Sequence, residues 1–282
     1  MASQEGDEDD VDPLKILLPE DQNGGNSLST VHSGEGNLQL QRHYLRSIQS
    51  TVVIRQLPSR GLSFQLWPAA TTLFTLLDND HCDPSNSPLA STLTAISTGS
   101  STRPLKILEL GSGTGLVGIA AAATLGADVM VTDLAHVIPN LQFNAEANAD
   151  VLASRGGRVK TAPLKWGDPG DVERMEKEFD FDLVLASDVV YHDHLYDPLI
   201  ETLRLLLLNG GGDENKKKER VFVMAHLRRW KKDSSFFKKA KKLFVVDVIH
   251  ADRPSEGSRI GVVVYRFSGK KKNLNSELPN NP

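Results

Sequence analysis

The segment LKILELGSGTGLVGIAAAATL, residues 105–125, decides the fold of this chain. Its first part, residues 105–110, is a short apolar run with the length and composition of a buried strand. Three glycines then follow at alternating positions, and residues 116–125 are apolar and long enough for a buried helix. A strand that passes through a glycine-rich loop into a helix is the opening unit of a doubly wound α/β fold.

The residues after this segment continue the alternation of strands and helices. Further strands are expected at residues 128–132, 158–162, 181–186, 221–226, 243–250 and 260–267. Helices are expected at residues 138–149, 198–208 and 234–242. The pattern predicts a doubly wound α/β sheet of seven strands, mostly parallel and covered by helices on both faces. Residues 251–259 are too few for a parallel crossover, so the last strand is expected to be antiparallel.

The chain divides into four parts by composition. Residues 1–36 are acidic and then rich in Gly, Asn and Ser, and we expect them to be mostly disordered. Residues 37–103 form an N-terminal β extension with a loop, and residues 104–268 form the core. Residues 269–282 are a polar tail. The fold is therefore expected in the third part, with the second part appended to it.

Within the N-terminal extension, an alternating pattern begins at residues 37–40, and Thr51–Arg55 predicts a strand. A second short strand is expected to end at residues 64–67. Pro68 suits the first position of a helix over Pro68–Leu77. The Ser/Thr/Pro-rich residues 79–103 are expected to form an irregular loop.

The overall composition limits the class of protein. The chain has 282 residues, 39% hydrophobic and 24% charged, with a net charge of −4, so its overall field does not attract nucleic acid or an anionic membrane. Cys82 is the only cysteine, which excludes an internal disulfide and a zinc site of paired cysteines. With no secretory signal and no long apolar stretch, we expect a cytoplasmic or nuclear monomer without membrane contact.

The glycine loop predicts a ligand site. Glycines let the backbone approach a ligand closely, and the helix that follows offers unpaired N–H groups. The candidate cofactor-binding residues here are Gly111, Ser112, Gly113 and Gly115. The spacing of Gly113, Gly115 and Gly118 also satisfies the dinucleotide fingerprint, so the loop alone leaves the cofactor open.

Asp133 ends the second strand, and a carboxylate there can accept hydrogen bonds from both hydroxyls of an adenosine ribose. NAD and S-adenosylmethionine both carry that ribose. Glu109, directly before the loop, favours a cationic sulfonium because a carboxylate would repel a pyrophosphate. The antiparallel last strand also favours S-adenosylmethionine, which we therefore predict as the cofactor.

Four motifs occur in order: LELGSGTGLVGIAAA at 108–122, VTDL at 131–134, LKWGD at 164–168 and DLVLASDVVY at 182–191. Together with LWPAA at 66–70, they resemble the family 16 methyltransferase-like proteins, which are seven-strand protein-lysine methyltransferases with some chaperone-directed members. The resemblance covers roughly residues 50–267. It implies a class I methyltransferase fold, S-adenosylmethionine as cofactor and a protein substrate, with chaperone-type proteins among the candidates.

The resemblance also implies roles for individual residues. Trp67 would close over the cofactor near its methionine end, Asp133 would hold the ribose, and Trp166 would lie beside the adenine. Ser187 would lie under the cofactor, in a tripeptide that reads Ala-Ser-Asp where many relatives have Gly-Ala-Asp. The loop residues implied to line the cofactor are Gly111, Ser112 and Gly113.

Asp188 and Tyr191 follow the fourth strand of the core and are the candidate catalytic residues. Methyl transfer needs a neutral amine, and we expect these two side chains to orient it. Asp188 is too weak a base to deprotonate lysine, and capping of the next turn is its structural alternative. His192 and His194 are interpreted as surface residues, and no metal is expected. Histidine or small-molecule methylation, an NAD-dependent oxidoreductase and a non-catalytic scaffold remain alternatives.

Overall fold

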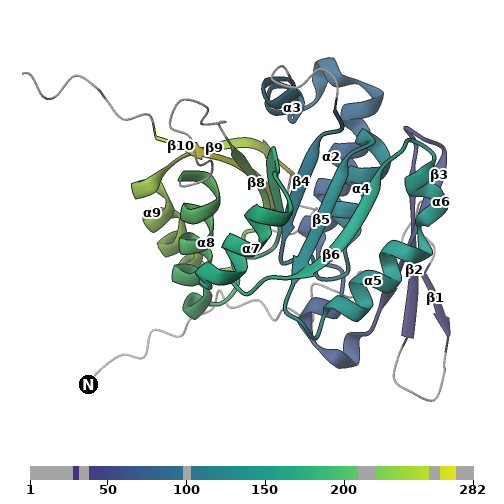
Figure 1. Cartoon of the computed structure of the whole chain (residues 1–282), viewed down its shortest axis with the longest axis horizontal. Helices are drawn as coiled ribbons and strands as arrows, with labels where there is room; N and C mark the ends of the chain where they lie inside the picture. The colour runs from purple at the N-terminus through teal and green to yellow at the C-terminus, as the bar shows by residue number, and fades with distance from the viewer. Residues whose placement is uncertain (1–27, 32–37, 98–102, 209–219, 254–260, 271–282) are drawn as a thin grey trace, which may run out of the picture.

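A seven-stranded sheet forms the centre of the computed structural model (Figure 1). The structure describes residues 28–31, 38–97, 103–208, 220–253 and 261–270. In sheet order the strands are β6 (Arg158–Pro163), β5 (Asp128–Asp133), β4 (Lys106–Leu110), β7 (Leu183–Ser187), β8 (Val221–Leu227), β10 (Val262–Gly269) and β9 (Phe244–Ala251). Neighbours from β6 to β8 are parallel, and β10 is antiparallel to both β8 and β9. The doubly wound class I methyltransferase sheet with an antiparallel last strand is therefore confirmed.

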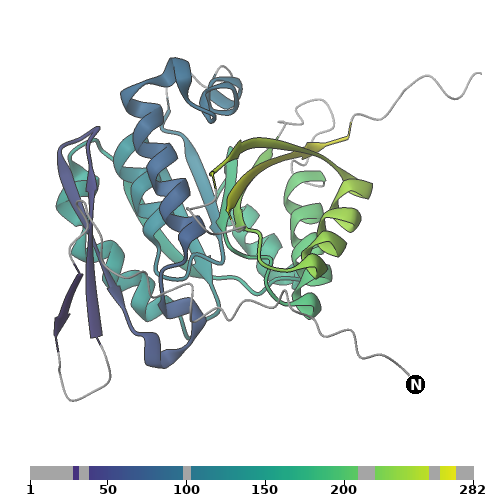
Figure 2. The ribbon, with the colours of Figure 1, turned by 180° about the vertical axis from the view of Figure 1, so that it is seen from behind.

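Helices cover both faces of the sheet (Figures 1 and 2). The helices are α2 (Pro68–Cys82), α3 (Ala90–Ser97), α4 (Leu116–Leu125), α5 (Ile138–Ala147), α6 (Ala149–Ala153), α7 (Pro169–Glu178), α8 (Tyr196–Leu208) and α9 (Ser234–Leu243). Among the described residues, every helix is too short or too polar to cross a bilayer.

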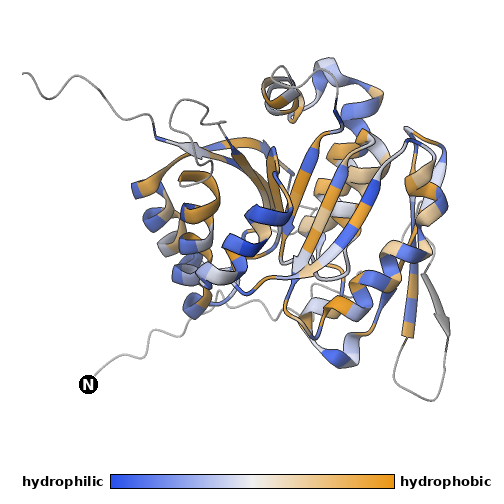
Figure 3. Ribbon diagram, viewed as in Figure 1, coloured by the Kyte–Doolittle hydropathy of each residue, from blue (hydrophilic) through white to orange (hydrophobic). Residues whose placement is uncertain are grey.

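Two apolar clusters hold these layers together. Alternate side chains of a strand point to opposite faces, so Ile107 packs with α2 and α4, whereas Leu108 packs with α7, α8 and α9. Figure 3 shows the same central strands as the most hydrophobic part of the ribbon. Each cluster is continuous across the sheet, which explains why the strands read as apolar runs rather than as alternating patterns.

Two details of the prediction for the N-terminal extension were wrong. Residues 79–103 are not one irregular loop, because α2 continues to Cys82 and α3 lies beyond it. The expected second strand ending at residues 64–67 is replaced by two 3₁₀ turns, Pro58–Arg60 and Leu62–Phe64, since Gly61 between them adopts a φ of 115° that breaks extended structure.

Helix α7 was missed, although its signals are in the sequence. Pro169 occupies the first turn, and the Asp168 side chain accepts hydrogen bonds from the backbone N–H groups of Gly170 and Asp171. Within residues 1–36, which were expected to be mostly disordered, Leu28–Val31 form β1. The rest of that prediction lies outside the described residues, as does the polar tail from residue 271 onward.

The extension is a separate three-stranded antiparallel sheet of β1, β2 (Leu38–Leu45) and β3 (Ser50–Gln56). Two buried asparagines of α5 and its C-terminal end dock it on the core. The Asn148 amide pairs with both backbone groups of Val53 at 2.8 Å, and the Asn144 amide pairs with those of Arg55 at 2.9 and 3.1 Å. Asn144 Nδ2 also donates to the carbonyl of Thr114 at 2.9 Å, so the same side chain joins the extension to the glycine loop.

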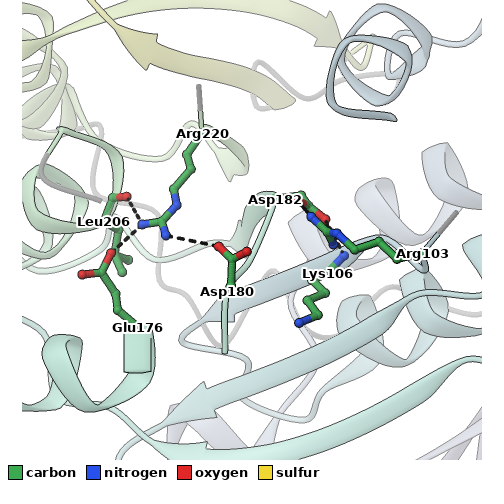
Figure 4. Close-up of polar contacts among 7 residues, drawn as sticks. All are labelled: Arg103, Lys106, Glu176, Asp180, Asp182, Leu206 and Arg220. Carbon is green, nitrogen blue, oxygen red and sulfur yellow. Dashed lines mark hydrogen bonds and ion pairs between the residues drawn. The ribbon is translucent and has the colours of Figure 1, made fainter. Parts of the chain in front are cut away.

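The amino ends of the central strands are fixed by ion pairs (Figure 4). Buried Asp182 accepts hydrogen bonds from the Arg103 guanidinium at 2.6 and 2.9 Å and from the backbone N–H of Lys106 at 2.9 Å. Arg220, just before β8, pairs with Glu176 of α7. These contacts hold the end of the sheet opposite the glycine loop, which leaves the other end free to carry a site.

We predict that Asn144→Ala lowers the free energy of unfolding by about 3 kcal/mol, because it removes three hydrogen bonds and leaves the backbone N–H of Arg55 without its partner. Urea denaturation measures this change. The control is Gln142→Ala on the same helix, which removes only an exposed contact with Glu146 and should change stability by less than about 0.5 kcal/mol. Equal effects of the two substitutions would contradict the docking role.

Candidate active site

A cavity of about 400 Å³ lies at the carboxyl ends of β4, β5 and β7. Nine of the ten candidate site residues line it: Trp67, Gly111, Ser112, Gly113, Asp133, Trp166, Ser187, Asp188 and Tyr191. The tenth, Gly115, lies behind them as the residue before α4, with a left-handed φ of 84°. The structure thus brings residues from five separate segments of the sequence to one cavity.

The backbone of the glycine loop is left-handed where it borders the cavity. Gly111 has a φ of 59°, and a Cβ on it would come within 2.7 Å of the Trp166 ring. Gly113 has a φ of 55°, and a Cβ there would lie 3.1 Å from the carbonyl oxygen of Ser63. Both positions therefore need glycine, for the backbone conformation and for the close approach of neighbouring segments.

Asp133 faces the cavity and also holds the loop. Its Oδ2 accepts a hydrogen bond from the backbone N–H of Gly113 at 2.9 Å, and its Oδ1 accepts one from Leu134 at 2.7 Å. Burial raises the pKa of Asp133 above its ordinary value, and the two backbone hydrogen bonds oppose that rise. The carboxylate is thus placed at the end of β5 where a polar ligand group can reach it.

Glu109 does not lie against the cavity, contrary to the sequence argument that placed it beside a cationic ligand. Its side chain is fully buried behind the loop, and Oε2 accepts a hydrogen bond from the backbone N–H of Gly118 in α4 at 2.9 Å. Its Oε1 has no hydrogen-bond partner among the described residues. Burial raises the pKa of Glu109 to about 8, although hydrogen bonds from Ser112 and Gly118 oppose the rise. Glu109 therefore supports the loop from behind and does not touch a ligand.

Asp188 lies in a buried ion pair. It has a φ of 60°, unusual for a residue with a side chain, and its backbone N–H donates to the carbonyl of Ala225 at 2.9 Å. Its carboxylate accepts hydrogen bonds from the Arg229 guanidinium and, at 3.3 Å, from the backbone N–H of Leu227. The side chain is only 2% exposed. This carboxylate is committed to the protein, so its geometry favours the structural alternative of holding the turn.

Further buried polar groups lie behind Asp188. The fully buried His226 has Nδ1 at 3.8 Å from Asp188 Oδ1 and Nε2 at 3.3 Å from Asp233 Oδ2. Asp233 Oδ1 in turn accepts a hydrogen bond from the Tyr196 hydroxyl at 2.9 Å. The turn that carries Asp188 is therefore connected to α8 and to the segment before α9.

Tyr191 is half-buried, and its ring lies 4.7 Å from that of His192. Burial and the charge of Asp133 raise the pKa of Tyr191, so its hydroxyl stays protonated at neutral pH. His192 stacks on His194 at 5.4 Å, and both are exposed at the rim of the cavity. The pKa of His192 is lowered, first by burial and then by His194 and Lys232.

Sequence reasoning missed Arg229 and Trp230. The Arg229 guanidinium lies between two tryptophan rings, 5.1 Å from the centre of Trp67 and 5.4 Å from that of Trp230. Both residues follow the carboxyl end of β8, and the rule that sites gather at such ends could have pointed to them. Of the ion pair formed by Asp188 and Arg229, only Asp188 lies in a recognisable sequence motif.

The model of a protein family described as lysine methyltransferase matches residues 47–243. The chain belongs to the lysine methyltransferase family. The matched residues include β3, the glycine loop and the turn at Asp188, so they contain most of the cavity lining. The resemblance based on ordered sequence motifs is confirmed, and a typical dinucleotide-dependent oxidoreductase is excluded by the family.

The names of similar proteins agree with this family membership. Protein N-lysine methyltransferase METTL21A from Danio rerio is 28% identical over 257 residues, which are 91% of this chain and 98% of the relative. METTL21A from Mus musculus is 32% identical over 176 residues, which are 62% of this chain and 71% of the relative. EEF1A lysine methyltransferase 3 from Mus musculus is 32% identical over 144 residues, which are 51% of this chain and 50% of the relative.

Solved structures with a similar arrangement include the METTL16 MTase domain, with a TM-score of 0.45 and 12% identity over 66% of this chain and 67% of that one. Another is P. horikoshii TYW2 in complex with MeSAdo, with a TM-score of 0.45 and 11% identity over 82% and 72%. Both likenesses are weaker than the family match.

We predict that Glu109→Gln removes a pH dependence of stability. Folded Glu109 keeps its proton up to about pH 8, whereas the unfolded chain releases it near 4.5. The folded state binds more protons in this interval, so the free energy of unfolding falls as pH rises from about 5 to 8. Glutamine stays neutral, and melting curves at pH 5 and 8.5 should show the variant losing less stability than the wild type, by a few kcal/mol. Exposed Glu178→Gln is the control; parallel curves for all three proteins would disprove the effect.

We predict that Asp188→Asn costs about 3 kcal/mol of stability, because Arg229 is left buried without a counter-charge while asparagine still tolerates the positive φ. The double variant Asp188→Asn with Arg229→Met should recover part of the loss, since no charge then remains unpaired. Arg228→Met is the exposed control. Additive losses in a double-mutant cycle measured by urea denaturation would show that the two residues are not coupled.

Proposed function

We propose that this protein transfers a methyl group from S-adenosylmethionine to a lysine side chain of a protein substrate. The proposal rests on one observation: a chain of the lysine methyltransferase family has a cavity that is lined by the glycine loop and by Asp133. The printed names of the relatives, which are protein-lysine methyltransferases, favour lysine over histidine or a small molecule.

The lining residues fit this cofactor. Asp133 offers carboxylate oxygens to a ribose, and the Trp166 ring, packed on Gly111, offers an apolar face to the adenine. Trp67 also lines the cavity, in contact with Arg229, and we assign the methionine end of the cofactor to its side. When bound there, S-adenosylmethionine would supply an electrophilic methyl group on a sulfonium.

The chain's own task is to present a neutral amine. A lysine with an ordinary pKa of about 10.4 costs roughly 4–5 kcal/mol to deprotonate at pH 7. Burial of the amine among the apolar lining residues of the cavity, such as Leu66 and Val189, would disfavour its charged form by desolvation, which lowers this cost. The protonated Tyr191 hydroxyl has lone pairs that can accept a hydrogen bond from the amine and so orient it.

Asp188 acts as a positioning residue in this proposal. Its ion pair with Arg229 fixes the turn that leads to Tyr191, and it keeps the guanidinium beside Trp67. The turn sets where the tyrosine hydroxyl lies, and small displacements of an orienting group are costly for displacement chemistry.

The single cysteine and the net charge of −4 support action in the cytoplasm or nucleus, and we propose that the protein acts as a monomer.

The test measures cofactor binding and methyl transfer together. Calorimetric titration should show binding of S-adenosylmethionine and none of NAD, and Asp133→Ala should weaken binding roughly a hundredfold by removing hydrogen bonds to the ribose. Asp128→Ala, at the other end of the same strand, is the control and should bind normally. Melting temperatures are compared in parallel, because Asp133 also holds Gly113 and Leu134.

Methyl transfer is then followed by incubating a cell lysate with tritiated S-adenosylmethionine and mapping the label by mass spectrometry. Label on a protein lysine is the expected result. Normal donor binding by Asp133→Ala would refute the ribose assignment. Label found only on histidine or on small molecules would refute the proposed acceptor.

A further inference from the structure

A second cavity, of about 640 Å³, lies beside the candidate active site, between the segment after β8, helix α9 and the last two strands. We name it the basic groove. Its defining residues are the cationic Arg228, Lys231, Lys238 and Lys241 and the aromatic Trp230 and Tyr265. None of these residues has a part in the cofactor site except Trp230, which lines both cavities.

The groove is positively charged although the chain as a whole carries −4. Four cationic side chains line it against one carboxylate, Asp233. That carboxylate is buried and already accepts the Tyr196 hydroxyl and lies against His226, so it does not neutralise the rim. All four of these cationic residues are exposed. A surface of this kind selects negatively charged partners.

The floor of the groove is apolar. Phe237 and Tyr265 contact each other with ring centres 4.5 Å apart, and Val248 beside them is 60% exposed. Lys238 and Lys241 lie one turn apart on α9, so their charges follow the same edge. An apolar floor with a cationic rim fits an extended peptide that carries acidic and aliphatic side chains.

The groove continues into the candidate active site through Trp230. The ring of Trp230 lies against Arg229, whose other side contacts Trp67 in the cofactor cavity. A chain whose lysine enters that cavity beside Trp230 would therefore have its neighbouring residues over the groove. We propose that the basic groove binds an acidic segment flanking the target lysine of the protein substrate. This inference rests on the proposed function and specifies the kind of substrate sequence it would accept.

The test compares two fluorescein-labelled peptides of about twelve residues, each with one lysine. One carries Asp and Glu beside the lysine, and the other carries Asn and Gln at the same positions. Fluorescence anisotropy with the full-length protein should show the acidic peptide binding at least about fivefold more tightly at low salt. The preference should shrink as the salt concentration rises, because exposed charges are screened.

Matched double variants test the location. Lys238→Gln with Lys241→Gln should reduce the acidic preference by about fivefold or more, since both side chains line the groove. Lys239→Gln with Lys242→Gln removes the same charge from the same helix but away from the lining, and should keep the preference. Equal binding of the two peptides by the wild type, or equal losses in the two double variants, overturns the proposal.

Two other occupants are separate outcomes. A single-stranded RNA of equal length that binds more tightly than the acidic peptide, through Lys238 and Lys241, would overturn the proposal in favour of nucleic acid. The chain's own acidic residues Glu5, Asp7, Glu8, Asp9 and Asp10 are the second candidate. If their replacement by Gln and Asn tightens peptide binding several-fold, the groove belongs to the N-terminal segment instead.

Failure of this inference is distinguishable from failure of the proposed function. Calorimetric binding of S-adenosylmethionine is measured on the same wild-type and variant proteins, and neither pair of lysine substitutions should change it. A wild type that binds no donor rejects the proposed function. Intact donor binding without an acidic preference rejects the groove alone.

Discussion

The left-handed glycine loop at the carboxyl end of β4 is the constraint on which the rest of the site depends. Four side chains hold this backbone. Asp133 accepts a hydrogen bond from Gly113, and Glu109 accepts one from Gly118. Asn144 donates a hydrogen bond to the Thr114 carbonyl, and Trp166 packs on Gly111. Each comes from a different element. The position of the loop therefore depends on β5, β4, α5 and the β6–α7 connection together.

Buried carboxylates near the site meet the cost of desolvation in different ways. Asp188 is paired with Arg229 and hydrogen-bonded to backbone, which compensates the charge. Glu109 has Gly118 and Ser112 as hydrogen-bonding partners and no ion pair within the described part of the chain, so burial favours its protonated form. Asp133 lies between these cases, with two backbone hydrogen bonds and access to the cavity. Asp133 and Asp188 both line the cavity, but the carboxylate of Asp188 is already paired with Arg229, which leaves Asp133 as the candidate to bind a ligand group.

Most of the fold was predictable because its signals are local. Buried parallel strands are apolar runs, and the short link before the last strand limits its direction to antiparallel. The errors also have local causes. Gly61 replaces an expected strand by two turns, and the cap at Asp168 was overlooked in a polar segment whose helix buries only Val172 and Met175. The extension was recognised through Thr51–Arg55, but not how it docks.

The sequence by itself determined the order of elements, the glycine loop and the residue types at its strand ends, because periodicity, turn chemistry and motif spacing are properties of neighbouring residues. Only the tertiary structure decided which way each side chain faces. It turned Glu109 away from the cavity and placed Arg229, forty-one residues after Asp188, against that carboxylate. It also gathered lysines of α9, Trp230 from the segment after β8 and Tyr265 of β10 into one groove. Such pairings depend on how strands and helices pack across the sheet, which no local pattern encodes.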